Sequence, residues 1–91
     1  MTNEQKALAA RLERAATAQE HQKPETAGLL RRAVKFAHAS PEERLLELPG
    51  PLMFELGEEA ARLGKLGNCG PLADRVDEAA ELVRKLISTE L

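Results

Sequence analysis

Residues 70–88 read GPLADRVDEAAELVRKLIS and contain the most regular apolar pattern in the chain. The apolar positions recur every three or four residues, which places them on one face of a helix. They are Leu72, Val76, Ala79, Ala80, Val83, Leu86 and Ile87. Acidic residues lie early in this stretch, and Arg84 and Lys85 lie late, which is the charge order that the helix dipole favours. The pattern predicts an amphipathic helix over residues 70–88 with one side buried.

Two further helices are predicted before residue 40. Thr2 and Gln5 have the spacing of a capping box, in which each side chain bonds a free backbone N–H at a helix start, so a first helix is expected over 3–20. A second, over 24–39, begins at Pro24, because proline suits the first helical turn. Gly28 inside it costs about 1 kcal/mol relative to alanine, so we expect either thin local support or another backbone crossing closely.

The middle of the chain predicts a short helix and a longer one. Ser40, Pro41 and Glu43 combine an N-cap, a proline at the first helical position and a capping-box acid, which favours a helix over 41–48. Pro49-Gly50-Pro51 is not expected to continue it, so a fourth helix is expected over 51–64. We therefore predict one all-α domain over residues 1–91, a compact bundle of four main helices plus one short helix. The second, fourth and fifth helices should supply most of its core.

The amino-acid composition agrees with the packing of helices on helices. It also argues against strong electrostatic attraction to nucleic acid or membranes. Of the 91 residues, 43% are hydrophobic and only two are aromatic, Phe36 and Phe54. Thirteen basic and fifteen acidic residues give a net charge of −2, which provides no strong attraction to nucleic acid or an anionic membrane. No apolar run approaches the length of a membrane span, and the single cysteine suits a reducing compartment. The expected location is the cytoplasm.

The sequence carries no recognisable catalytic or cofactor motif. The chain has no glycine-rich phosphate loop, no nucleophile elbow and no His-Glu-x-x-His sequence. Two histidines and one cysteine, far apart in the chain, lack the local pairing of a zinc site. We therefore expect no enzyme activity, no cofactor and no metal. A thiol-dependent protein using Cys69, or a phosphotransfer protein using His38, is kept as an alternative.

The stretch from Leu45 to Leu56 is richer in large apolar residues than a surface corner requires. Seven of its twelve residues are Leu, Met or Phe. Either the corner plugs one end of the bundle or part of it stays exposed as an interface. Met53 and Phe54 are adjacent on a helix and cannot both face one core, so one of them is expected to contact a partner. The predicted partner-binding residues are Leu46, Leu48, Met53 and Phe54, joined by Asp77 and Glu81 from the acidic strip of the last helix.

Protein binding is the leading functional hypothesis. We expect a non-catalytic interaction module, such as a small regulator, adaptor or inhibitor, which also forms a homodimer because its apolar positions exceed what a small bundle buries. The bias towards Ala, Leu, Arg and Glu is typical of GC-rich coding, as in short accessory proteins of bacteria and phages. The alternative of a different class is a small DNA-binding regulator, which would use Arg31, Arg32 and Lys35 to contact phosphates.

Overall fold

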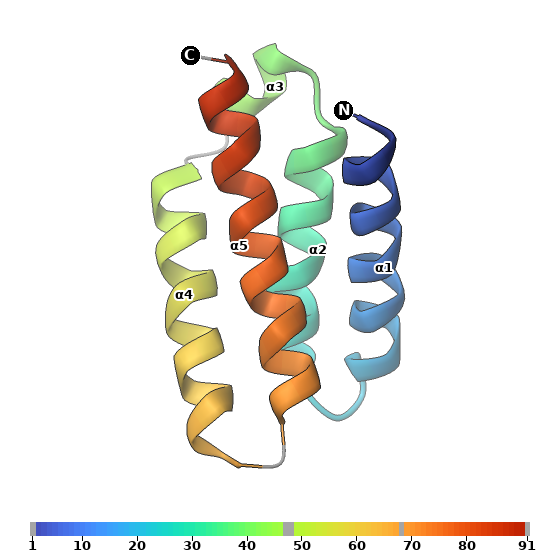
Figure 1. The fold of residues 1–91 in the computed structure, drawn as a ribbon, viewed down its shortest axis with the longest axis vertical. Coiled ribbons are helices and arrows are strands. Elements are labelled where there is room, and N and C mark those ends of the chain that lie inside the picture. Colours follow the sequence, from blue (N-terminus) through green and yellow to red (C-terminus); the bar gives the residue numbers. More distant parts are fainter. Residues whose placement is uncertain (1, 47–48, 68, 91) are drawn as a thin grey trace.

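The computed structural model describes residues 2–46, 49–67 and 69–90, and these form five helices. In chain order they are α1 (Asn3–Gln19), α2 (Pro24–His38), α3 (Pro41–Leu46), α4 (Pro49–Lys65) and α5 (Gly70–Glu90). The four long helices run alternately down and up the bundle, and α3 lies at one end of it (Figure 1). The predicted all-α bundle of four main helices plus one short helix is confirmed.

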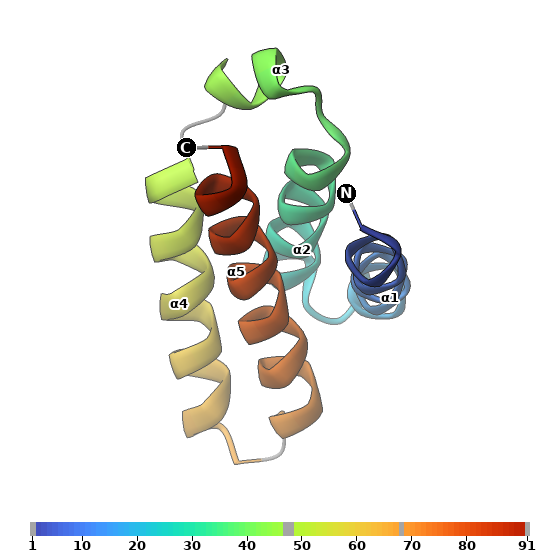
Figure 2. The ribbon, with the colours of Figure 1, turned by 45° about the horizontal axis from the view of Figure 1, so that its top comes forward.

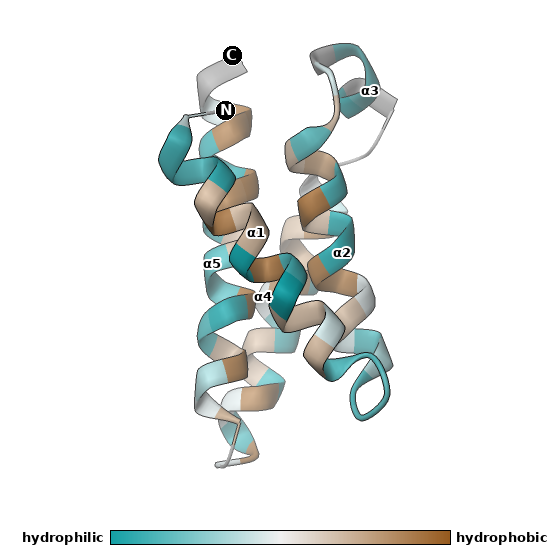
Figure 3. Cartoon of the chain, turned by 90° about the vertical axis from the view of Figure 1, so that its right-hand side faces the viewer, coloured by the Kyte–Doolittle hydropathy of each residue, from teal (hydrophilic) through white to brown (hydrophobic). Residues whose placement is uncertain are grey.

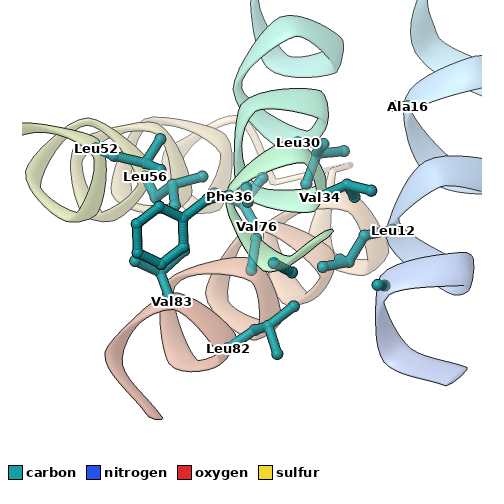
Figure 4. Packing of buried hydrophobic residues seen from close by; sticks show 14 of the residues in the cluster. Leu12, Ala16, Leu30, Val34, Phe36, Leu52, Leu56, Val76, Leu82 and Val83 are labelled. Atoms are coloured by element: carbon teal, nitrogen blue, oxygen red, sulfur yellow. The ribbon is translucent and has the colours of Figure 1, made fainter. Parts of the chain in front are cut away.

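The helices pack so that α2 and α5 are central and α1 and α4 lie on opposite sides. Figure 2 shows α4 beside α5 and α1 beside α2, with α3 crossing from α2 towards α4. Phe36 of α2 points towards α4 and α5, which contribute Leu56 and Val83 to the same buried cluster (Figure 4). The core comes mainly from α2, α4 and α5, as expected, since α1 adds only Ala9, Leu12 and Ala16 to its fully buried part.

Helix α1 packs through a narrow face because its buried positions are mostly alanine. Figure 3, in which α1 faces the viewer, shows hydrophilic and hydrophobic bands alternating along it. Its start is fixed by the predicted capping box. The Gln5 backbone N–H donates to Thr2 Oγ1 at 3.1 Å, and the Thr2 N–H donates to Gln5 Oε1 at 2.9 Å.

The junction between α3 and α4 differs from the sequence expectation. Pro49-Gly50-Pro51 was expected to separate the helices, with the fourth beginning at Pro51, but α4 begins at Pro49. The first turn of a helix has backbone N–H groups without helical partners, so two prolines there remove no helical hydrogen bond. The other end of α4 lies at Lys65, one residue past the expected end, and Gly67 adopts a positive φ of 75° just after the helix.

Arg44 ties the short helix α3 to the end of α2. Its Nε donates to the Phe36 carbonyl at 2.8 Å, and its terminal nitrogen donates to the Ala37 carbonyl at 2.6 Å. Its guanidinium also lies 5.4 Å from the centre of the Phe36 ring. The Arg44 guanidinium therefore satisfies two carbonyls at the negative end of the α2 dipole and also lies over the ring of Phe36.

Candidate protein-binding surface

The structure shows which described side chains of the apolar stretch Leu45 to Leu56 belong to the core and which are exposed. Leu52 and Leu56 are fully buried in the core, and Met53 is half-buried against it. Phe54 is 66% exposed, the larger of the two exposures found among large hydrophobic side chains in the described residues. Leu48 and the side chain of Leu46 lie outside the described part of the chain. Of the two adjacent candidates, Phe54 is the one that faces solvent.

Phe54 lies at the edge of a strip of α4 that carries no charge, with the exposed Glu58 on its other side. A helix turns by about 100° per residue, so residues near position 54 in space are three, four or seven positions away. We call this strip the outer α4 face and define it by six residues. They are Gly50, Met53, Phe54, Gly57, Ala61 and Gly64. All are exposed except the half-buried Met53. A surface helix face normally carries charged or polar residues, and this one does not.

The glycines of the outer α4 face have no packing role within the chain. A Cβ built at Gly57 or Gly64 would meet nothing within 4 Å. The same holds at Gly28 of α2, so of the two alternatives for that glycine the structure shows no closely crossing backbone, which leaves thin local support of the helix. An interior helical glycine costs about 1 kcal/mol relative to alanine. Gly57 therefore weakens α4 without serving any contact inside the described structure.

A buried polar contact lies on the other side of α4, where α4 meets α2. Thr26 of α2 is fully buried, and its hydroxyl donates to Glu59 Oε2 at 2.7 Å. Arg62 Nε donates to the other carboxylate oxygen of Glu59 at 2.5 Å. Glu59 is only 7% exposed, so these bonds compensate a charge held largely away from water. The contact fixes how α4 sits on α2.

The ionisation of Glu59 follows from those bonds. The hydrogen bond from Arg62 lowers the pKa of the carboxyl below its usual 4.5, and the bond from Thr26 lowers the pKa further. Burial acts in the opposite direction, but the net change in pKa is downward. Both oxygens of this carboxylate are occupied, so its arrangement is that of a structural anchor and not of a free acid or base.

An open groove of about 610 Å³ runs between α2 and α4 along this contact. Its lining is largely charged, and Leu29 and Ala61 are its apolar members. Glu55 is neutralised by an ion pair with Arg32 across the two helices. Such a shallow, charged groove lacks the enclosed apolar shape of a small-molecule site. It borders the outer α4 face, with which it shares Ala61.

The basic cluster considered for nucleic-acid binding is mostly engaged by the chain's own acids. Arg31 lies 2.7 Å from Glu20 and 3.8 Å from Glu13 in ion pairs that join α2 to α1 and its following turn. Arg32 pairs with Glu55, while Lys35 is exposed. The Glu20 contact raises the pKa of Arg31, as expected for a paired guanidinium. These two arginines hold helices together, which weakens the argument that they contact phosphates.

The acidic strip of α5 is also partly neutralised. Glu78 lies 2.7 Å from Arg75 and 3.3 Å from Arg11 of α1. Glu81 pairs with Arg84, which lowers the pKa of its carboxyl. Asp77 is exposed. Of the two acids predicted to bind a partner, Asp77 remains a plain surface charge and Glu81 already has a cation beside it.

Residues considered for thiol or phosphoryl chemistry are spread over the bundle. Cys69 is half-buried and its carbonyl accepts the first helical bond of α5, from the Ala73 N–H at 2.9 Å. His38 ends α2, and the end of α2 and the start of α5 lie at opposite ends of the bundle (Figure 1). His21 is almost fully exposed in the turn after α1, 3.6 Å from Glu20. Over the described ranges, no group of three or more His, Cys, Asp or Glu side chains is placed to hold a metal.

Two features of this surface were missed from the sequence. The glycines at 50, 57 and 64 recur every seven residues, and this spacing is visible in the sequence as one helix side. Glu59 lies three residues after Leu56 and four before Leu63, so a charge within the apolar stripe of α4 already indicated a buried partner. That this partner is Thr26, 33 residues away in the sequence, is determined by the fold.

Comparison with known proteins adds no family to these observations. No protein-family model, curated protein or solved structure matches the chain. Among the described helices, none is both long and apolar enough to cross a membrane.

Proposed function

We propose that this chain is a non-catalytic protein-binding module and that the outer α4 face is its contact surface. The observation that carries the proposal is the 66% exposed ring of Phe54 at the edge of the uncharged outer α4 face. Aromatic residues are enriched at interfaces, and burying a Phe side chain fully is worth about 1.5–3 kcal/mol. A regulator, adaptor or inhibitor acting in the cytoplasm would bind in this way, and a reducing compartment suits the lone thiol of Cys69.

The surrounding residues favour a flat partner surface over a small ligand. The glycines and Ala61 leave the backbone of α4 close to solvent, so a partner helix can approach it nearly to backbone contact. Phe54 then projects from this low surface as a single large anchor, the form in which a few residues dominate binding energy. Core burial of Leu52 and Leu56 on the opposite side holds α4 rigidly for this role.

Photo-crosslinking in the native cell tests the proposal. A photo-reactive phenylalanine analogue placed at position 54 should form covalent adducts on illumination. The same analogue at Asp77, an exposed position on α5, is the matched control and also tests the acidic strip. Adducts specific to position 54 are expected. Adducts at position 77 alone, or at neither position, would show that the outer α4 face is not the contact surface.

A further inference from the structure

Helix α1 packs on α2 and α5 through a small buried face and exposed ion pairs, and we infer that it is a detachable cover of the bundle. It opens from α2 and α5 as one unit while α2, α4 and α5 stay packed together. Opening exposes the apolar surface of α2 and α5 that α1 covers when closed. This movement does not involve the outer α4 face, so it stands apart from the proposed function.

Few side chains of α1 lie in the core, and most of those are small. Of its 17 residues only Ala9, Leu12 and Ala16 are buried, whereas the 15 residues of α2 include seven that are buried. Leu12 is the one large side chain among the three, and it lies with Leu30 and Val34 between α1 and α2 (Figure 4). The stabilisation of a packed helix grows with the apolar area it buries. An alanine buries little such area, so α1 is held less firmly than α2.

The seam between α1 and α5 is open at both of its ends. A cleft of about 280 Å³ lies between the start of α1 and the later turns of α5, with Leu8 and Leu82 in its lining. A second cleft, of about 270 Å³, lies between the end of α1 and the start of α5, with Ala15 and Leu72 in its lining. Protein interiors are normally packed without such gaps. The contact between α1 and α5 is therefore incomplete.

Exposed ion pairs also link α1 to its neighbours. Arg11 of α1 lies 3.3 Å from Glu78 of α5, and Arg31 of α2 lies 3.8 Å from Glu13 of α1. These four side chains are between 26% and 49% exposed. Ion pairs of this kind stabilise a contact only weakly and are screened by salt. Opening leaves Glu78 with a cation beside it, because Arg75 of the same helix lies 2.7 Å away.

The other long helices share a core to which α1 adds little. Their contact includes the buried hydrogen bond from Thr26 of α2 to Glu59 of α4. Among the described residues, eight of the nine largest fully buried side chains belong to α2, α4 and α5, and Leu12 of α1 is the ninth. The eight are Thr26, Leu30, Leu52, Leu56, Leu63, Val76, Leu82 and Val83. The core that joins these three helices therefore stays largely intact when α1 leaves.

Native-state hydrogen exchange on the full chain, followed by NMR in low concentrations of urea, tests whether α1 opens separately. The amides of Leu12 and Ala16 report on α1, and those of Leu30, Leu56 and Val83 report on the other three helices. Relative to an unstructured chain, both α1 amides should exchange at least about tenfold faster than the other three. Their exchange should also depend less on urea, because local opening exposes less surface than global unfolding. Smaller differences in rate, or an equal dependence on urea, would overturn the inference.

Two matched arginine variants test the part played by the ion pairs. Arg31→Gln removes the cation that α2 places beside Glu13 of α1, so exchange of the α1 amides should become about twofold to fivefold faster. Arg84→Gln removes an equally exposed pair with Glu81 inside α5 and should leave exchange in α1 unchanged. Raising NaCl from about 0.02 M to about 0.5 M should accelerate α1 exchange in the wild type more than in Arg31→Gln. Equal exchange of the α1 amides in the two variants would overturn the inference.

Discussion

Replacing Thr26 by valine should destabilise the protein through one lost hydrogen bond. Valine has nearly the shape of threonine and a similar helix propensity, so packing and helix formation change little. The hydroxyl donates at 2.7 Å to Glu59 Oε2, and both residues are buried. A hydrogen bond to a charged group contributes about 1.5–3 kcal/mol, and the buried oxygen finds no substitute donor in valine. We expect Thr26→Val to lower the free energy of unfolding at pH 7 by that amount.

Urea unfolding followed by circular dichroism measures this loss, and a second background isolates its cause. In Glu59→Leu the acceptor is absent and leucine extends the apolar stripe of α4, so Thr26→Val should cost less than about 0.5 kcal/mol there. The cost should also shrink in wild-type background as pH falls below the usual Glu value of 4.5, because protonation removes the charge that the hydroxyl stabilises. An equal cost in both backgrounds would refute the reasoning.

Three further predictions concern α4 and the core. Gly57→Ala should raise the stability of the monomer by about 0.5–1 kcal/mol in urea unfolding, because the added Cβ meets nothing within 4 Å and alanine favours the helix; a loss of stability would mean that the position is sterically restricted. Because the pKa of Glu59 is lowered by folding, its stabilising charge is fully present above the unfolded value of 4.5 and is lost as pH falls through the folded value. Acid titration of Glu59→Gln should therefore show a shallower loss of stability in acid than the wild type, and parallel curves would contradict this. Leu56→Ala should lower the free energy of unfolding by about 2–5 kcal/mol, because Leu56 is 0% exposed in the core. Thermal unfolding measures this loss, and a midpoint temperature equal to that of the wild type would place Leu56 outside the core.

The helices were predictable because their signals are local. The stripe of α5, the capping box at Thr2 and the N-cap at Ser40 all act within one or two turns, and each appears in the structure. The sequence pattern predicts the start of α4 two residues too late, because Pro49-Gly50-Pro51 is typical of a break between helices. Whether a proline lies before a helix or within its first turn depends on where the preceding helix ends. The local sequence specifies that end poorly.

The candidate surface was only partly predictable for a physical reason. Adjacent Met53 and Phe54 had to point in different directions, but the fold decides which of them meets the core. The engagement of Arg31 and Arg32 with acids on other elements also depends on the fold, since those acids lie 11 to 23 residues away in hydrogen-bonded pairs. The charge patterns along α2 and α5, taken one helix at a time, therefore suggest a free basic strip and a free acidic strip. In the structure, ion pairs neutralise most of both strips.

Backbone amide chemical shifts, followed as unlabelled extract of the native cell is added, test most directly whether the outer α4 face is the contact surface. Isotope-labelled wild type is compared with and without the extract, so that every residue reports without substitution. We predict shifts or line broadening grouped at Phe54, Gly57, Ala61 and Gly64, with Asp77 on α5 unaffected. Changes grouped on α1 or α5 with none on α4 would contradict the proposed surface.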